Sequence, residues 1–230
     1  MLLATDLRPI TGRWRATFSR IDRYGLPELS TNSLSIGSGQ PWKWLGRPWF
    51  IDLNAASTGD ELYSEYKSDI RIRVAVRQLP FCHVGVRGGV QTLQVKGYGT
   101  RSQAVVGANA GVNLTWDLSL EGRVDGVALP GGTLPVSMAS PQGSIGLDYS
   151  PGKLWMSLRF QLRPQWEPQI FLLSDLEVNK RIRLKVLWRE RPDMFGGGIG
   201  YSFDRFSLSV AYTYQPIIGS TRSLAMAVSW

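Results

Sequence analysis

The C-terminal segment, residues 205–230, alternates apolar side chains with small or polar ones in two runs separated by Pro216–Ser220. A period of two is typical of a β-strand with one apolar face, and the Pro- and Gly-containing segment between the runs favours a turn. The pattern therefore predicts a β-hairpin whose other face is small and polar. The second run ends the chain on an aromatic residue, Trp230, at an apolar position.

This hairpin resembles the closing strand of bacterial outer-membrane β-barrel proteins, in which the assembly machinery reads a C-terminal strand of alternating apolar residues ending in Phe or Trp. The resemblance is to that broad superfamily and covers about half of the chain as a pattern. It implies a bacterial outer-membrane protein that contacts the lipid bilayer and the barrel-assembly machinery. The residues that match the assembly signal are Leu224, Met226, Val228 and Trp230.

Length and composition are compatible with one domain over residues 1–230. Apolar residues make up 43% of the 230-residue chain, which is too many for a disordered protein, and the 25 glycines and 13 prolines supply turns. No apolar run approaches the roughly 18 residues that a membrane-spanning helix needs. A strand crosses with only about 9 to 11 residues, so the chain is predicted to cross a membrane as strands.

Further alternation predicts an all-β, transmembrane, antiparallel up-and-down barrel of about 12 strands, with 10 to 14 as the range. The Gly88-Gly89 pair suggests a bulge or a switch of face. Residues 104–124 are either one tall strand or two strands with a turn near 109–111, and residues 24–59 are predicted to be a long loop with short strands near 33–37 and 49–54. The remaining predicted strands cover residues 10–20, 68–78, 82–87, 93–95, 145–149, 154–163, 168–178, 181–189 and 199–203.

The polar face of these strands is rich in arginine, whereas the acidic residues assigned to it are few, namely Asp117, Glu121 and Asp125. A soluble β-barrel or β-sandwich also alternates, but with its apolar face inward and usually with mixed Lys/Glu pairs outside. Aromatic residues at the ends of the apolar face favour the membrane barrel. The basic residues predicted to line the lumen are Arg13, Arg15, Arg71, Arg73, Arg77, Arg87, Arg159, Arg163, Arg181, Arg183, Lys185 and Arg189.

Basic residues exceed acidic ones by 8, and the pI is near 9.9, but neither a basic helix nor an aromatic-basic surface motif points to nucleic acid. A single cysteine and a single histidine make a Cys/His zinc site improbable, and no cofactor is predicted. The N-terminus lacks the features of a signal peptide, which export would require. We therefore expect a mature form from which a leader has been removed.

Three functions are compatible with these patterns. The first is a passive pore, of the porin type, that transports small anionic solutes through an arginine-lined lumen. The second is a non-enzymatic barrel that anchors other envelope proteins. The third is a lipid-modifying hydrolase that pairs His83 with a serine or threonine and a carboxylate, although no local motif specifies that partner. The arginine-rich face favours the pore, and the protein is predicted not to be an enzyme.

Overall fold

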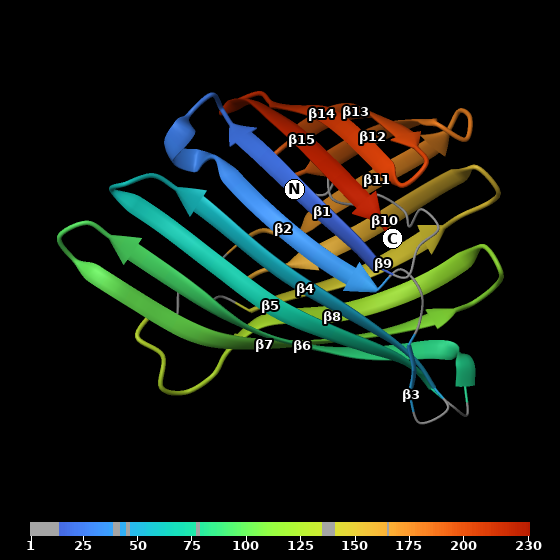
Figure 1. The fold of residues 1–230 in the computed structure, drawn as a ribbon, viewed down its shortest axis with the longest axis horizontal. Helices are drawn as coiled ribbons and strands as arrows, with labels where there is room; N and C mark the ends of the chain where they lie inside the picture. The colour runs from blue at the N-terminus through green and yellow to red at the C-terminus, as the bar shows by residue number, and fades with distance from the viewer. Residues whose placement is uncertain (1–13, 39–41, 45–46, 77–78, 135–140, 165) are drawn as a thin grey trace.

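The computed structural model describes residues 14–38, 42–44, 47–76, 79–134, 141–164 and 166–230. Within these residues, fourteen strands form a closed antiparallel barrel (Figure 1). The ring consists of β1 (Trp14–Arg23), β2 (Thr31–Ser38), β4 (Arg47–Gly59), β5 (Tyr63–Val76), β6 (Leu79–Val95), β7 (Gly99–Asn113), β8 (Leu118–Ala128), β9 (Gln142–Tyr149), β10 (Leu154–Leu162), β11 (Gln169–Glu177), β12 (Ile182–Glu190), β13 (Met194–Phe203), β14 (Phe206–Gln215) and β15 (Gly219–Ser229). A short strand, β3 (Trp42–Trp44), pairs with the start of β4, and η1 (Pro27–Leu29) is a 3-10 turn after β1.

The first and last strands close the ring. β1 pairs antiparallel with β15, and β2 pairs with β4, so the sheet has no gap at the β3 segment. Trp14 and Trp230 exchange two backbone hydrogen bonds, each 3.0 Å long from nitrogen to oxygen. The prediction of an all-β barrel is confirmed, and the strand number lies at the upper end of the predicted range. In the described part of the chain no helix has the length and apolarity to span a membrane.

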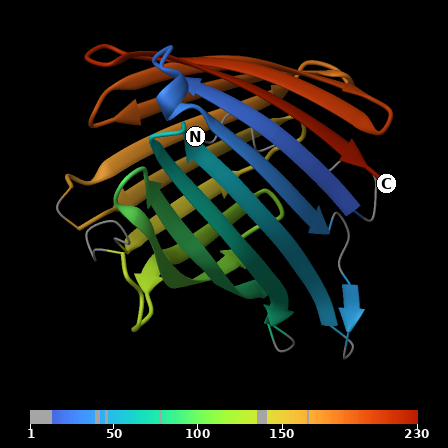
Figure 2. The same cartoon turned by 60° about the vertical axis from the view of Figure 1, so that its left-hand side comes forward.

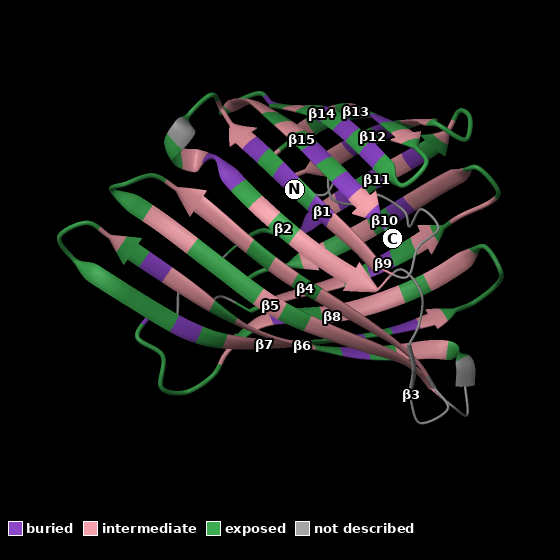
Figure 3. Ribbon diagram, in the orientation of Figure 1, coloured by how far each residue is buried: buried purple, intermediate pink, exposed green. Residues whose placement is uncertain are grey.

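The apolar positions of the strands face outward. Side chains such as Phe18, Val86, Val186, Ile199 and Met226 are about half exposed, and their sequence neighbours are less exposed. Figure 3 shows this alternation of exposed with intermediate or buried residues along several strands. Tyr212, Tyr214 and Trp230 lie at the ends of this band, where aromatic residues of membrane barrels meet the lipid headgroups. A continuous apolar outer surface on a closed barrel requires lipid around it, so the alternative of a soluble barrel with an inward apolar face is wrong.

The barrel has two mouths. Trp14 and Trp230 lie at one end, which we call the terminal mouth, together with the turns 114–117 and 150–153. The other end, which we call the loop mouth, holds the connection 24–30 and three-residue turns such as 60–62 and 96–98. β5, β6 and β7 contain 14, 17 and 15 residues, against 8 to 11 in β9 to β15, and the turn between β6 and β7 extends further to the left than the other turns (Figure 1). Figure 2 shows these teal and green strands on the wall opposite to the orange and red strands.

The turn between β4 and β5 shows how a glycine and an aspartate shape the loop mouth. Gly59 has φ = +117°, and any side chain there would meet the backbone of Tyr63 and Ser64. The carboxylate of Asp60 accepts hydrogen bonds from the backbone N–H groups of Leu62 and Tyr63, both 2.9 Å long. These two hydrogen bonds stabilise the ionised form, so the pKa of the Asp60 carboxyl lies below its usual value.

Three local predictions differ from the structure. Residues 24–59 were predicted as a long loop with short strands near 33–37 and 49–54. These two strands are confirmed as β2 and the first half of β4, but the 13-residue β4 continues to Gly59, so less of the segment is loop than predicted. β7 continues through residues 109–111 to Asn113, so the turn lies after them. The register of β5 and β6 is unbroken at Gly88 and Gly89, and its irregularity lies at Ala75/Val76 instead. The predicted change of face at these glycines is therefore wrong, and Leu93 faces the lumen, 8% exposed.

A small apolar cluster lies inside the barrel on the side of β10 to β14. Phe171, Leu173, Leu187 and Ala211 are buried together, and Trp155 and Met194 pack against them. These residues lie at inward positions of their strands, where polar side chains were expected. The neighbouring inward positions of β13 to β15 carry small residues, and among them Ser209, Ala225 and Ala227 are almost fully buried. This side of the interior is therefore packed with protein.

Candidate functional site

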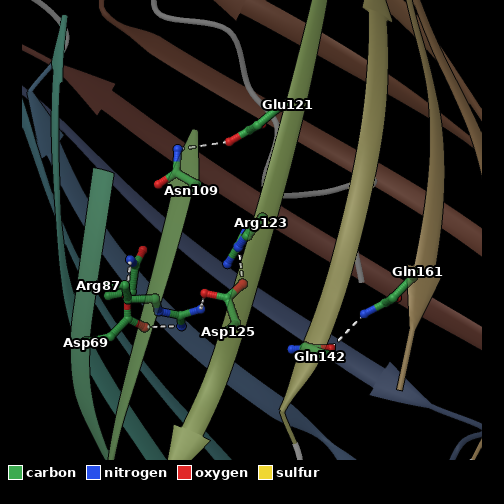
Figure 4. A network of polar contacts seen from close by, with 9 residues as sticks. Asp69, Arg87, Asn109, Glu121, Arg123, Asp125, Gln142 and Gln161 are labelled. Carbon is green, nitrogen blue, oxygen red and sulfur yellow. Dashed lines mark hydrogen bonds and ion pairs between the residues drawn. The ribbon is translucent and has the colours of Figure 1, made fainter. Parts of the chain in front are cut away.

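The opposite wall of the lumen, formed by β4 to β8, carries a group of ionised side chains. We call the following residues the arginine–aspartate cluster: Asp52, Asp69, Arg71, Arg73, Arg87, Arg123 and Asp125. All of them occupy inward-facing positions, because they share the parity opposite to the exposed apolar residues of the same strands. Figure 4 shows four of them with the polar residues on either side.

Arg87 on β6 connects three strands of the cluster. Its guanidinium donates hydrogen bonds to Asp69 on β5, at 2.5 Å, and to Asp125 on β8, at 3.4 Å (Figure 4). The carboxylate of Asp125, which is 6% exposed, also forms an ion pair with Arg123. One aspartate thus holds two arginines, and charge-assisted bonds of this kind are about twice as strong as neutral ones.

A glycine on the intervening strand makes this contact possible. Gly107 on β7 is the cross-strand partner of Arg87, and a side chain at Gly107 would collide with the carboxylate of Asp125 and with the backbone of Val124. The register of β7 and β8 also shifts beside Gly107, between Val106 and Ala108. Arg87 can therefore reach across β7 to β8 because β7 has no side chain at that position.

Hydrogen bonds extend the cluster along the wall. Asn54 on β4 donates to Asp69 at 3.0 Å, and Ser35 on β2 donates to the side-chain oxygen of Asn54 at 2.7 Å. The Arg73 guanidinium lies 3.1 Å from the Asp52 carboxylate and 5.5 Å above the Phe50 ring. These contacts link polar side chains from β2 to β8 and help to hold the wall in one arrangement.

Arg71 differs from the other arginines of the cluster. Its cross-strand neighbours are Asp52 on β4 and Arg87 on β6, but Asp52 pairs with Arg73 instead. Among the described residues, Arg71 forms neither a hydrogen bond nor an ion pair. It does interact electrostatically at longer range with Arg73, Arg87, Arg123 and Asp125. A partly exposed guanidinium with no carboxylate of its own is therefore available on the lumen wall.

Further polar contacts lie beside the cluster. Asn109 donates a hydrogen bond to Glu121 at 3.1 Å, and Gln161 donates to Gln142 at 2.6 Å (Figure 4). Arg159 on β10 donates to Ser157 and lies 3.9 Å from Asp148. The inner face thus carries polar contacts from β2 to β10, and the apolar cluster lies on the side of β10 to β14.

The predicted lumen residues divide into three groups. Those on strands, at inward positions, are Arg15, Arg71, Arg73, Arg87, Arg159, Arg183, Lys185 and Arg189. Arg163 and Arg181 lie just outside β10 and β12, at opposite mouths, and are exposed; Arg181 lies over the Phe203 ring at 5.9 Å. Arg13 and Arg77 lie outside the described residues.

The sequence reasoning missed Arg123 and most of the acidic partners. Asp117 lies in the turn between β7 and β8, but Glu121 and Asp125 face the lumen with Asp52, Asp69, Asp148, Asp175 and Glu177. Arg183, for example, lies 3.4 Å from Glu177. The expectation that acidic residues are too few to pair with the arginines is therefore wrong for most of the cluster. Asp69 could have been placed on the inward face from the sequence, because it alternates with Arg71 and Arg73 along the same predicted strand.

Arg189 on β12 is held without a carboxylate. It donates hydrogen bonds to the backbone oxygen of Pro192 and to the side-chain oxygen of Gln215, both 3.2 Å long, and lies 6.0 Å from the Phe171 ring centre. Arg163 is close enough to interact electrostatically with it. Arg189 and Arg163 therefore place two positive charges at the loop mouth, near the apolar cluster.

His83 lies on β6 at an inward position, and its ring occupies the space above Gly111 on β7. In the described part of the chain, neither a hydroxyl nor a carboxylate forms a hydrogen bond with it, and no group of His, Cys, Asp and Glu residues is arranged to hold a metal ion.

The residues of the predicted assembly signal lie on the outer face of β15, with Trp230 directly after its end.

No family model matches the chain, and no curated protein sequence matches it. Solved structures do. Omp33 of Acinetobacter baumannii, an outer membrane protein, has a TM-score of 0.61 at 8% identity, covering 95% of this chain and 98% of that one. The toluene transporter TbuX of Ralstonia pickettii has a TM-score of 0.62 at 8% identity, with coverages of 96% and 90%.

A FadL homologue of Pseudomonas aeruginosa has a TM-score of 0.60 at 10% identity, covering 94% of this chain and 89% of that one. At such low identities the likeness shows a shared fold. That fold is the outer-membrane β-barrel, in agreement with the resemblance of the C-terminal strand. The shared fold and the apolar outer band of the barrel agree with the predicted location in a bacterial outer membrane.

Proposed function

We propose that the protein is a passive outer-membrane pore for small anionic solutes. The observation that carries this proposal is the arginine–aspartate cluster, in which charged side chains on the inner wall leave Arg71 without a carboxylate. Ionised groups inside a barrel are stable where water reaches them, so the cluster supports a wet path beside β4 to β8. The similar structures include one whose name describes a transporter.

The sign of the charge supports anions over cations. Aspartates neutralise Arg73, Arg87 and Arg123, but Arg71 and Arg189 have no ion-pair partner among the described residues. A fixed charge acts over a Debye length of about 8 Å at physiological salt, which is comparable with the radius of a small lumen. Two uncompensated guanidinium groups therefore favour the entry of anions along the path.

Reversal potentials in planar bilayers test this proposal. A salt gradient across a bilayer containing the purified protein should show chloride more permeant than potassium, with a selectivity that weakens as ionic strength rises. Changing Arg71 and Arg189 together to Glu should reverse the preference. The matched control changes Arg20 and Arg222 to Glu, because these two arginines lie at outward positions of β1 and β15 and should leave selectivity unchanged. A conducting but cation-selective wild type would refute the anion assignment.

A closed scaffold that anchors other envelope proteins is the second candidate. The apolar cluster around Leu187 favours it, because this cluster fills part of the interior beside β11 to β14. The same bilayer recording separates the two functions. Absence of conductance from correctly folded protein, verified by the shift between boiled and unboiled samples on a denaturing gel, would replace the pore with the scaffold.

A further inference from the structure

We propose that Arg71 is the centre of a binding site for one small monocarboxylate on the lumen wall. The inference deepens the proposed pore and rests on its water-filled path. A general excess of positive charge would attract anions without binding them at one place. The inference instead assigns a saturable binding site to one residue.

The charge balance of the arginine–aspartate cluster points to a missing anion. It contains four guanidinium groups, Arg71, Arg73, Arg87 and Arg123, and three carboxylates, Asp52, Asp69 and Asp125. Every carboxylate has an arginine partner, and the remaining positive charge is that of Arg71. One added negative charge at Arg71 would make the cluster neutral.

The sheet register explains why Arg71 is left over. Asp52 stands directly opposite Arg71 on β4, yet its carboxylate lies 3.1 Å from Arg73, one inward position further along β5. On its other side Arg71 faces Arg87, whose donors are already directed to Asp69 and Asp125. The donors of Arg71 therefore have no protein acceptor in the described residues, while the groups beside it are fixed.

The chemistry of the donor selects the ligand. A guanidinium is a planar fork whose two parallel N–H groups match the two oxygens of a carboxylate. Three neighbouring arginines add attraction, but Asp69 and Asp125 lie in the same cluster and would repel a second negative charge on the ligand. A singly charged carboxylate therefore fits better than a dianion such as hydrogen phosphate.

Calorimetric titration of the full-length, detergent-solubilised protein with sodium acetate tests the site directly. We expect saturable binding with one acetate per chain, and weaker binding of phosphate at a pH where it is doubly charged. Arg71→Gln should weaken acetate binding about 10- to 100-fold, the factor expected for hydrogen bonds to a charged group. Arg71→Lys, which keeps the charge without the fork, should fall between the wild type and Arg71→Gln.

Arg101→Gln is the matched control. Arg101 lies at an inward position of β7 near the loop mouth and is exposed, so its removal deletes one lumen charge away from the cluster. Equal losses of acetate binding in Arg71→Gln and Arg101→Gln would overturn the site in favour of diffuse attraction. If Arg71→Gln fails to fold, the Arg71→Lys comparison carries the test, and unchanged affinity in it would also overturn the inference.

Bilayer recordings separate the site from the pore. Under the inference, acetate should block chloride current saturably in the wild type and at concentrations about 10- to 100-fold higher in Arg71→Gln. If the pore is anion-selective but acetate does not bind saturably, the binding site is refuted and the proposed function is not. Acetate binding by calorimetry in a protein that does not conduct would retain the site and remove the pore.

Discussion

Arg71 and Arg87 are direct cross-strand partners on β5 and β6, so two guanidinium groups project side by side into the lumen. Like charges in such positions destabilise a sheet. Here Asp69 and Asp125 offset the repulsion, because both accept hydrogen bonds from Arg87. The pair is tolerated because these two carboxylates are in place.

Replacement of Asp125 by Asn should therefore destabilise the barrel. The carboxylate is buried and shared by Arg87 and Arg123, and removal of one partner from a buried ion pair costs roughly 3 to 5 kcal/mol. Urea unfolding of protein refolded in lipid vesicles measures the change in free energy of unfolding. Asp117→Asn, in the exposed turn after β7, is the control and should change it by less than about 0.5 kcal/mol. Equal effects of the two substitutions would contradict the structural role of Asp125.

Val186→Arg tests which face of the sheet meets lipid. Val186 lies in the middle of β12 and is 56% exposed on the outer face, so an arginine there should cost about 2 to 4 kcal/mol near the bilayer midplane. Thr213→Arg places the same side chain at a partly buried inward position of β14 and should cost less. Ser209, also inward, is unsuitable as a control because it is only 2% exposed and has no room for arginine. A milder effect at Val186 than at Thr213 would refute the assignment of faces.

Leu187→Ala tests the apolar cluster inside the barrel. Leu187 is 2% exposed, and its truncation should lower the free energy of unfolding by about 2 to 5 kcal/mol through lost burial and an unfilled cavity. Leu184→Ala on the outer face of the same strand leaves no internal cavity, since Leu184 is 44% exposed, and should cost less. In bilayers, Leu187→Ala should also raise single-channel conductance, because it removes bulk from the interior. A loss of stability no larger than that of Leu184→Ala would show that the cluster contributes little.

Deletion of Trp230 should reduce assembly in cells more than refolding in detergent. The residue contributes two backbone hydrogen bonds to Trp14 and one aromatic side chain, a small part of a completed barrel, whereas recognition of the last strand precedes closure. Heat-modifiability of membrane fractions and of refolded protein measures the two effects. Trp230→Phe keeps an aromatic end and should assemble like the wild type. Normal membrane insertion without Trp230 would argue against the assembly signal.

The barrel class, the lipid-facing side and the C-terminal hairpin follow from the sequence, because lipid outside and polar groups inside impose alternation on every crossing strand. The first half of β4, near residues 49–54, was predicted, but its second half was missed because Ala55 to Thr58 are small residues without contrast between the faces. The cluster was only half predictable. Parity placed Arg71 and Arg87 inside, but whether Asp52 meets Arg71 or Arg73 depends on pairing between strands, which one sequence does not specify. The apolar cluster also escaped notice, because Leu187 interrupts a run of basic inward residues.

Because the strands differ in length, the barrel wall is not equally tall on all sides of the loop mouth. About 9 to 11 residues suffice for a strand to cross the bilayer, so the 17 residues of β6 leave roughly six beyond it, or about 20 Å of sheet. Because β5 and β7 are also long, part of this extra length makes the wall at the loop mouth taller on the side of β5 to β7 than on the side of β9 to β15. A molecule that moves along the membrane surface can reach the lumen directly from the side of β9 to β15. From the side of β5 to β7 it must first pass over the taller wall. The approach to the lumen is therefore directional in the plane of the membrane.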